Sequence, residues 1–293
     1  MQVHQEENMM KKILIVTDST ICMDINEAKE MGIIIAPLSV ILEGKEYQDQ
    51  VELSSADLVN KLKEKAAPKT SQPNLGLLDE MMKKFKEEDY DHIIVFALSS
   101  NLSGTYQAFR LAAAQNDLRN IDIVDTLTLA GPQRAVVLKA AEMAKGGASK
   151  EDILNMAQKA FKNTVSYLYP ETLEQLKRGG RVSPAAAALS SLLKIKALLI
   201  LENGATTIEK MGTARTETKI FEMLLESLEQ HQVSAKTHKL YLLSCEAMDT
   251  IDRFKEAATK KFGDIQYEVY ELPAVLAAHA GLGTIAVQAA LLD

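Results

Sequence analysis

The chain has 293 residues, a length that fits one large α/β domain or two smaller ones, and we expect two. Its net charge of −7 comes from 40 acidic and 33 basic residues without a lysine–arginine block, which argues against a nucleic-acid partner. The two cysteines, Cys22 and Cys245, are far apart in the sequence, so their spacing supports neither a disulfide scaffold nor a zinc site and favours a reducing, cytoplasmic setting.

The first half of the chain alternates between short apolar runs and segments of helical period. Residues 1–11 are polar, lack the apolar core of a signal peptide and are expected to form an extension outside the fold. The apolar runs that follow predict strands, at residues 13–17, 33–42, 92–98 and 121–126. Helical segments between them, such as 55–65 with Ser55 as its cap and 76–88, indicate βαβ units and a parallel sheet covered on both faces. No apolar run reaches the roughly 18 residues of a membrane span, so we expect no stable insertion into a membrane.

The pattern of apolar runs and helical segments changes after residue 165. An alanine-rich helix at 184–194, a strand pair around the turn 202–204, and alternating helices and strands as far as residue 272 predict a second α/β unit. We therefore expect an N-terminal α/β domain at 12–165 and a C-terminal α/β domain at 166–293. No long linker rich in proline, glycine or serine separates the halves, so they should pack closely and hold a ligand in the cleft between them.

Polar clusters follow the predicted strands of the first half, where ligands bind in open parallel sheets. They are "TDST" at 17–20, "SSNLSGT" at 99–105 and "DTLT" at 125–128, with "TSQPN" at 70–74 ahead of a helix. For any one cluster, helix capping is the commoner explanation, and Asp18 and Asp125 fit it well. A cap needs a single hydroxyl, however, and "SSNLSGT" supplies four. Hydroxyl groups in such excess around a helix N-terminus favour a site for an oxyanion.

Two motifs of the second half carry charged or titratable groups. In "LKRGGRVS" (176–183) the two glycines let the backbone bend, so that Arg178 or Arg181 turns towards the cleft, although a solvated basic loop is an equal alternative. His279 lies in an apolar stretch, where a histidine is more often a core residue, but two glycines follow it in "HAGLG" and allow a close approach to a ligand. The residues alone leave both choices open.

Signatures of common enzymes are missing from the sequence. It contains no Walker loop, no G-x-G-x-x-G, no H-E-x-x-H and no G-x-S-x-G elbow. A serine hydrolase that uses Ser103 or Ser100 with His279 remains as an alternative, without an obvious third residue to complete a triad. We expect no catalytic residue, no metal ligand and no cofactor site in this chain.

Taken together, the motifs resemble the DegV family of bacterial fatty-acid-binding proteins, which serve as the lipid-carrying subunit of fatty acid kinase. The resemblance runs from about residue 12 to the C-terminus. It rests on seven motifs in the expected order, "TDST", "APLSV", "TSQP", "LSSNLSGTYQ", "LEQLKRGGRVS", "RTETK" and "HAGLG". The sequence departs from the family's H-x-G-x-G-x-x-G ending, with Ala286 at the final glycine and Leu282 where proline is common.

The resemblance implies a two-domain α/β protein that encloses a long-chain fatty acid in an apolar tunnel, with the carboxylate held where the domains meet. The head-group residues that it implies are Thr70, Ser71, Ser99, Ser100, Asn101, Ser103, Arg181 and His279. Within the "SSNLSGT" loop, we expect Ser100 to touch the carboxylate, while Ser103 and Thr105 serve the helix.

The same resemblance implies a protein partner. A separate ATP-binding kinase subunit phosphorylates the bound carboxylate, and the carrier passes the acyl phosphate on towards phospholipid synthesis. Because this chain has no phosphate-cradling motif, we expect a carrier that is not an enzyme on its own. A third interpretation is an interaction protein whose lipid only fills the structure, which would bind lipid without any effect in a kinase assay.

Overall fold

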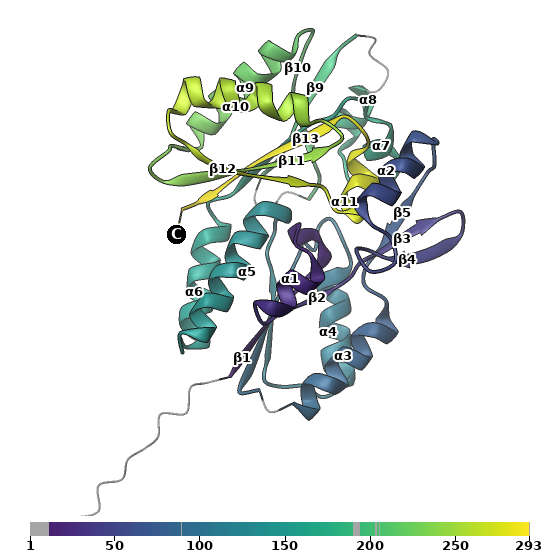
Figure 1. Ribbon diagram of the computed structural model, residues 1–293, viewed down its shortest axis with the longest axis vertical. Helices are drawn as coiled ribbons and strands as arrows, with labels where there is room; N and C mark the ends of the chain where they lie inside the picture. Colours follow the sequence, from purple (N-terminus) through teal and green to yellow (C-terminus); the bar gives the residue numbers. More distant parts are fainter. Residues whose placement is uncertain (1–11, 89, 190–193, 203, 205, 293) are drawn as a thin grey trace, which may run out of the picture.

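The computed structural model describes residues 12–88, 90–189, 194–202, 204 and 206–292 (Figure 1). The predicted extension at 1–11, residues 190–193 of the predicted alanine-rich helix and Asn203 of the predicted turn lie outside these residues. A parallel sheet lies in the lower half of Figure 1 and a six-stranded mixed sheet in the upper half, each covered by helices. The α/β fold class expected from the sequence is confirmed.

The parallel sheet is built from the apolar runs of the first half, in the order β2-β1-β6-β7. Its strands are β1 (Ile13–Asp18), β2 (Ile33–Ala36), β6 (His92–Ala97) and β7 (Ile121–Asp125). Side chains alternate along β1, so that Ile15 packs with α5 (Ala130–Lys145) and α6 (Lys150–Phe161) on one face. Leu14 and Val16 pack with α3 (Leu75–Glu87) and α4 (Thr105–Gln115) on the other. Burial on both faces explains why these strands read as uninterrupted apolar runs.

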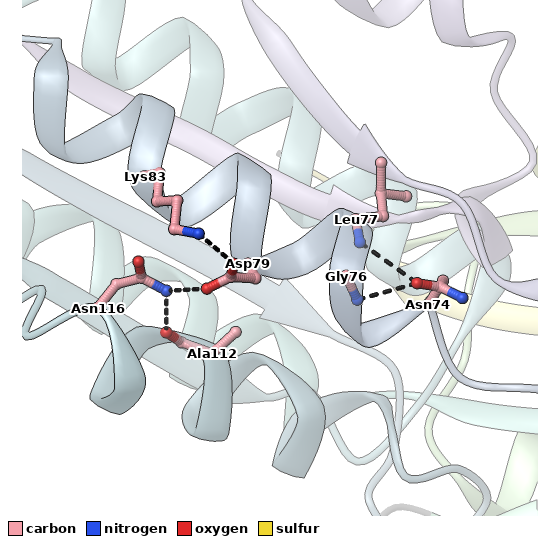
Figure 2. A network of polar contacts seen from close by, with 7 residues as sticks. All are labelled: Asn74, Gly76, Leu77, Asp79, Lys83, Ala112 and Asn116. Atoms are coloured by element: carbon pink, nitrogen blue, oxygen red, sulfur yellow. Dashed lines mark hydrogen bonds and ion pairs between the residues drawn. The ribbon is translucent and has the colours of Figure 1, made fainter.

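A small polar network joins α3 to α4 (Figure 2). Asn74 is the N-cap of α3 and accepts hydrogen bonds from two amides of its first turn. Asn116, directly after α4, donates through Nδ2 to Asp79 Oδ1 at 2.8 Å, and Asp79 also pairs with Lys83. The cap anchors the C-terminal end of the "TSQPN" loop beside α4.

The apolar run at 33–42 forms two strands, and its interpretation as a single strand is wrong. β2 ends at Ala36, and β3 (Ser39–Leu42) is the centre of a separate antiparallel sheet, with β4 (Lys45–Gln48) and β5 (Lys69–Ser71) at its edges. The break occurs at Pro37. Proline has no amide hydrogen to donate to a neighbouring strand, and it restricts the backbone of the residue before it, so β2 ends here. The small sheet carries Thr70, on β5, into the contact between the two halves of the chain.

Three short helical segments complete the first half. They are η1 (Ser19–Ile21), α1 (Ile25–Glu30) and α2 (Ser55–Lys63). The N-cap of α2 is Ser54 and not Ser55, because the Ser54 hydroxyl accepts from the amide of Asp57 while the Asp57 carboxylate accepts from the amide of Ser54. The expected cap was therefore wrong by one residue.

The second half forms a six-stranded sheet in the order β10-β9-β8-β13-β11-β12. Its strands are β8 (Val165–Tyr169), β9 (Lys196–Glu202), β10 (Glu209–Ala214), β11 (His238–Cys245), β12 (Gln266–Glu271) and β13 (Thr284–Leu291). Helices α9 (Glu217–Gln230) and α10 (Met248–Phe262) cover one face around Phe221, Leu224 and Phe254. The first strand of this sheet begins at Val165. The division of the chain into two domains near this residue stays a prediction.

The other face of this sheet meets the first half of the chain. Leu243 on β11 and Ala286 on β13 share a buried cluster with Val40 of β3 and Leu58 of α2. Helix α11 (Ala274–Ala280) lies between the halves, against α2, β5 and α7 (Glu174–Gly179) (Figure 1). The short helix α8 (Pro184–Ala188) follows α7 in the chain. A C-terminal helix thus carries its side chains into the contact between the halves.

Candidate functional site

A cavity of about 260 Å³ lies between the two halves of the chain, near the carboxyl ends of β1 and β6. Its wall is formed by Thr20, Leu38, Thr70, Ser71, Gln72, Leu98, Leu102, Ser103, Gly104, Leu129, Arg181, Ile208, Val275, Leu276 and His279. Of the predicted head-group residues, the structure brings together Thr70, Ser71, Ser103, Arg181 and His279 on this wall.

Two loops of the first half meet at the mouth of this cavity. Gly104 packs directly on the side chain of Gln72, and a Cβ atom at Gly104 would stand 2.1 Å from Gln72 Oε1. A residue with a side chain at this position would displace the end of the Gln72 side chain. Gln72, which the sequence analysis did not single out, thus joins the "TSQP" loop to the "SSNLSGT" loop.

Thr70 and His279 form the central polar contact of the cavity. Thr70 Oγ1 and His279 Nε2 lie 2.6 Å apart, which joins β5 to α11. Burial, helped by the positive charge of Arg181, lowers the pKa of His279 to about 4, so the imidazole is neutral at pH 7. His279 therefore offers the site a hydrogen bond and not a charge.

The packing of Gly179 favours one tautomer of His279. His279 Nδ1 is buried with no partner among the described residues, and a Cβ atom on Gly179 would lie 2.2 Å from it. The backbone of Gly179 thus lies against Nδ1, where a bare nitrogen accepts a Cα–H contact and an N–H group would repel it. With the hydrogen on Nε2, the ring donates to Thr70 Oγ1, and the Thr70 hydroxyl hydrogen is left for a ligand.

Arg181, and not Arg178, lies on the cavity wall. Arg181 Nε donates to the carbonyl of Leu102 at 3.1 Å, and Nη1 donates to the carbonyl of Gly179. Arg178 is exposed and donates to Gln175. A guanidinium held by two backbone carbonyls is pre-oriented, and its other N–H groups can bind an anion.

Helix α4 begins at the cavity wall. Its N-cap is Gly104, so no N-cap side chain accepts from the amides of the first turn. Ser103 Oγ accepts from the Thr105 amide at 3.3 Å and lies 2.9 Å from the Thr105 hydroxyl. Ser103 and Thr105 thus serve the helix, as expected, while Ser103 also lines the cavity. The remaining amides and the positive end of the helix dipole favour an anion at this end.

The other three loop residues predicted for the site lie outside the cavity wall. The carbonyl of Ser99 accepts from the amide of Ser103, so the chain turns back immediately after β6. This turn leaves Ser99 fully buried, directs the Ser100 amide to Asp125 Oδ1 at 3.0 Å and exposes Asn101. Among these loop serines, Ser103 therefore lines the cavity, while a contact of Ser100 with a carboxylate stays a prediction.

The described residues do not form the serine–histidine pair of a hydrolase. His279 Nε2 contacts Thr70, and the hydroxyl of Ser103 contacts Thr105. His279 Nδ1, where the acid of a triad would bind, has no partner in the described part of the chain.

An inner cavity of about 80 Å³ shares part of its wall with the first. The residues common to both walls are Leu102, Leu129, Ile208, Leu276 and His279. Beyond them the inner wall is mostly leucine and alanine, including Leu168, Leu243 and Ala286. A polar mouth that leads into an apolar interior suits an amphipathic ligand with one anionic end.

A buried polar network supports the wall from behind. Asp18 is fully buried and accepts from the amide of Leu98 at 2.7 Å and from Gln133 Nε2 at 3.2 Å. Burial raises the pKa of Asp18, and hydrogen bonds, chiefly from Thr20, oppose that shift. Asp18 therefore caps η1, as expected, and also ties the end of β1 to the end of β6. Nothing in the sequence pointed to Gln133 as its partner.

Comparison with known proteins decides the family. Residues 12–291 match the model of the DegV family, which is described as a family of uncharacterised proteins. This chain belongs to the DegV family. A DegV domain-containing protein of Halalkalibacterium halodurans is 34% identical over 279 residues, which are 94% of this chain and 97% of the relative.

Solved structures of DegV proteins share this fold. A fatty-acid-binding DegV family protein from Thermus thermophilus superposes with a TM-score of 0.84 at 32% identity, covering 96% of this chain and 100% of that protein. DegV from Bacillus subtilis, also a fatty acid binding protein, gives a TM-score of 0.82 at 27% identity over 96% of this chain and 100% of its own. The resemblance and the DegV-like fold expected from the sequence are confirmed, and DegV family proteins bind fatty acids.

Two further properties concern the residues that the structure describes. Among the described helices, none combines the length and apolarity needed to cross a bilayer. The described histidine, cysteine, aspartate and glutamate residues form no group of three or more placed to hold a metal ion.

Proposed function

We propose that this protein binds a long-chain fatty acid, with its carboxylate at the mouth and its acyl chain in the inner cavity, and presents it to a separate ATP-dependent kinase subunit for acyl phosphate formation. The observation that carries the proposal is that the two cavities share a wall at His279, with hydrogen-bond donors on one side and mostly leucine and alanine side chains on the other. Fatty acid binding by the T. thermophilus and B. subtilis relatives supports it.

The acyl chain supplies most of the binding free energy. Burial of each methylene contributes about 0.8 kcal/mol, so some fifteen methylenes contribute roughly 12 kcal/mol before the costs of association. The inner cavity, at about 80 Å³, is too small for such a chain, so its wall has to open when the ligand enters.

The carboxylate needs donors that replace its water. Thr70, oriented by His279, supplies one hydroxyl, and Ser103 lies beside the amides of α4. Arg181 supplies the positive charge, and hydrogen bonds to a charged group contribute about 1.5–3 kcal/mol each. Ser71, which is exposed on the wall, is an outer contact.

The phosphoryl group comes from a partner in this proposal. The sequence contains no Walker loop, and the donors that hold a carboxylate also suit an acyl phosphate. A kinase subunit that carries ATP would meet the carboxylate at the mouth. The carrier then works in the cytoplasm and passes its product on towards phospholipid synthesis.

Denaturing extraction of the purified protein, followed by mass spectrometry, tests the binding step. We expect a stoichiometric long-chain fatty acid, and a protein that holds none and takes up none when it is added would contradict the proposal. Uptake of fatty acid by an extracted and refolded sample shows that the site binds reversibly.

Addition of ATP and a bacterial fatty acid kinase subunit tests the transfer step, with hydroxylamine to trap the acyl phosphate. Product that requires both proteins supports the proposal. Ester hydrolysis by this protein alone would favour the hydrolase, and lipid binding without acyl phosphate would favour the interaction protein.

A further inference from the structure

We propose that Gln288 closes the inner end of the acyl cavity and sets the longest acyl chain that the protein accepts. The inference rests on the proposed function, because it concerns the tail of the fatty acid whose carboxylate lies at the mouth. Gln288 lies within β13, is 2% exposed and lines the inner cavity. The other polar side chains on that wall are Ser166 and His279.

The Gln288 amide bridges the two halves of the chain. On the sheet side, Nε2 donates to Ser166 Oγ at 2.8 Å, across the β13–β8 pair. On the side of the first half, Oε1 accepts from the Gly131 amide at 2.9 Å and Nε2 donates to the Leu129 carbonyl at 3.3 Å. Because both amide hydrogens and the carbonyl oxygen are engaged, this side chain is held as a fixed bridge between the sheet and the start of α5.

A third cavity, of about 20 Å³, lies near the other end of β13. Pro132 and Val136 of α5, Met156 of α6 and Ala290 of β13 line it. These are mostly apolar side chains, so the space beyond would suit the end of an acyl chain.

The Gln288 bridge stands between the inner cavity and this third cavity. Ala286, Gln288 and Ala290 are alternate residues of one strand, so their side chains share a face of the sheet. Ala286 lines the inner cavity and Ala290 lines the third. The start of α5 shows the same order, since Ala130 lines the inner cavity and Pro132 the third.

The bridge therefore ends the path of the acyl chain. Two residues of a strand span about 6.7 Å, the length of roughly five methylenes in an extended chain with carbon–carbon bonds of about 1.5 Å. Each methylene that finds apolar wall raises affinity roughly fourfold. A methylene that meets the fixed amide gains no such contact and forces the packed wall to rearrange. Affinity should rise with chain length up to a limit set by Gln288.

The test measures the affinity of the full-length protein and its variants for a homologous series of saturated fatty acids, by displacement of a fluorescent fatty acid. Gln288→Ala removes the bridge, so we expect the limit to move to longer acids, by as many as about five carbons where the wall of the third cavity opens as that of the inner cavity does. Affinity for the acids just beyond the wild-type limit should rise at least about tenfold.

A second variant and a control keep the test decisive. Gln288→Met keeps the length of the side chain but cannot form the bridge, so the limit should move in the same direction, less sharply. Val287→Ala is the matched control, because Val287 packs in the cluster on the opposite face of the sheet and should lose stability without a change in the limit. Thermal unfolding shows which variants are folded. If Gln288→Ala does not fold, the chain-length limit of Gln288→Met provides the test.

An unchanged limit in a folded Gln288 variant, while the wild-type protein binds fatty acid, overturns this inference and leaves the proposed function standing. An equal shift in Val287→Ala also overturns it, because general loosening of the sheet would then explain the result. If the wild-type protein binds no acid of the series, the proposed function itself fails.

Discussion

The two ends of the ligand cavity are built in opposite ways. The mouth takes its polar groups from four separate segments, which carry Thr70, Ser103, Arg181 and His279, and its hydrogen bonds have fixed directions. Apart from the Gln288 bridge, the inner end is lined mostly by leucine and alanine side chains from both halves, and these contacts have no preferred direction. Under the proposed function, the difference separates two properties of binding: the inner end would determine how tightly a fatty acid is held, and the mouth would determine where its carboxylate lies.

Acid should lower the stability of the fold through His279, which lines the mouth. Burial and Arg181 lower the pKa of His279 from 6.5 to about 4 in the folded protein. Between these values the unfolded chain binds a proton that the folded protein excludes, so His279 lowers the free energy of unfolding by up to about 3 kcal/mol as the pH falls. Urea unfolding at several pH values should therefore show a steeper loss for the wild-type protein than for His279→Gln.

Asp49 acts in the opposite direction over much of the same range. Burial raises its pKa to about 7, so its contribution to stability is present below its unfolded pKa and is lost as the pH rises towards 7. The wild-type protein and the His279→Gln variant both carry Asp49, so its effect on the free energy of unfolding cancels when the two are compared. Equal slopes for the two proteins would show that folding does not lower the pKa of His279.

Filling the inner end should cost affinity only for long acyl chains. Ala286 is buried on the inner wall, and Ala286→Leu adds three carbons to the space that the tail needs. Loss of about three buried methylenes corresponds to roughly 2.5 kcal/mol of binding free energy for a long-chain acid. Displacement titrations should show no loss for acids too short to reach Ala286, and an equal loss at every length would contradict the assignment of the inner end.

Removing the charge at the mouth should give the reverse pattern. Arg181→Gln is expected to weaken fatty acid binding by about 2 kcal/mol at every chain length, because the carboxylate loses a charge-assisted hydrogen bond. Methyl esters of the same acids, which carry no charge, provide the control and should bind both proteins alike. A loss that grows with chain length would place Arg181 in contact with the tail instead.

The smallest effect distinguishes two serines of one loop. Ser103→Ala should weaken binding of the carboxylate by about 1 kcal/mol, the value of one neutral hydrogen bond. Ser100→Ala should change it far less, since Ser100 lies outside the wall. Calorimetric titration with one fatty acid measures both, and a larger effect at Ser100 would restore the expectation drawn from the sequence.

The strands of the parallel sheet could be predicted from the sequence because their two buried faces leave a continuous apolar run, as at 92–98. The same signal failed at 33–42, since apolarity does not reveal that a chain leaves one sheet for another. Pro37 marked the change, and its missing amide hydrogen was the clue available.

The segments that meet at the mouth could also be predicted, but not the side chains that face the ligand. Ser100 and Ser103 are alike in type, and the turn after β6 alone decides which one lines the cavity. Gln72, Gln133 and Gln288 were missed because their partners are distant in sequence. A buried polar residue in an apolar strand, such as Gln288, needs a hydrogen-bond partner. The sequence therefore predicts that such a hydrogen bond exists, but it does not identify the partner.

Helix α11 forms part of both cavity walls, through Leu276 and His279. It has seven residues, about two turns, and is too short for its two sides to move independently. A shift of α11 that makes room for a tail therefore changes the distance from His279 to Thr70 at the mouth. If the protein carries a fatty acid as proposed, the position of this one imidazole would differ between the filled and the empty interior, at the mouth where a partner would dock.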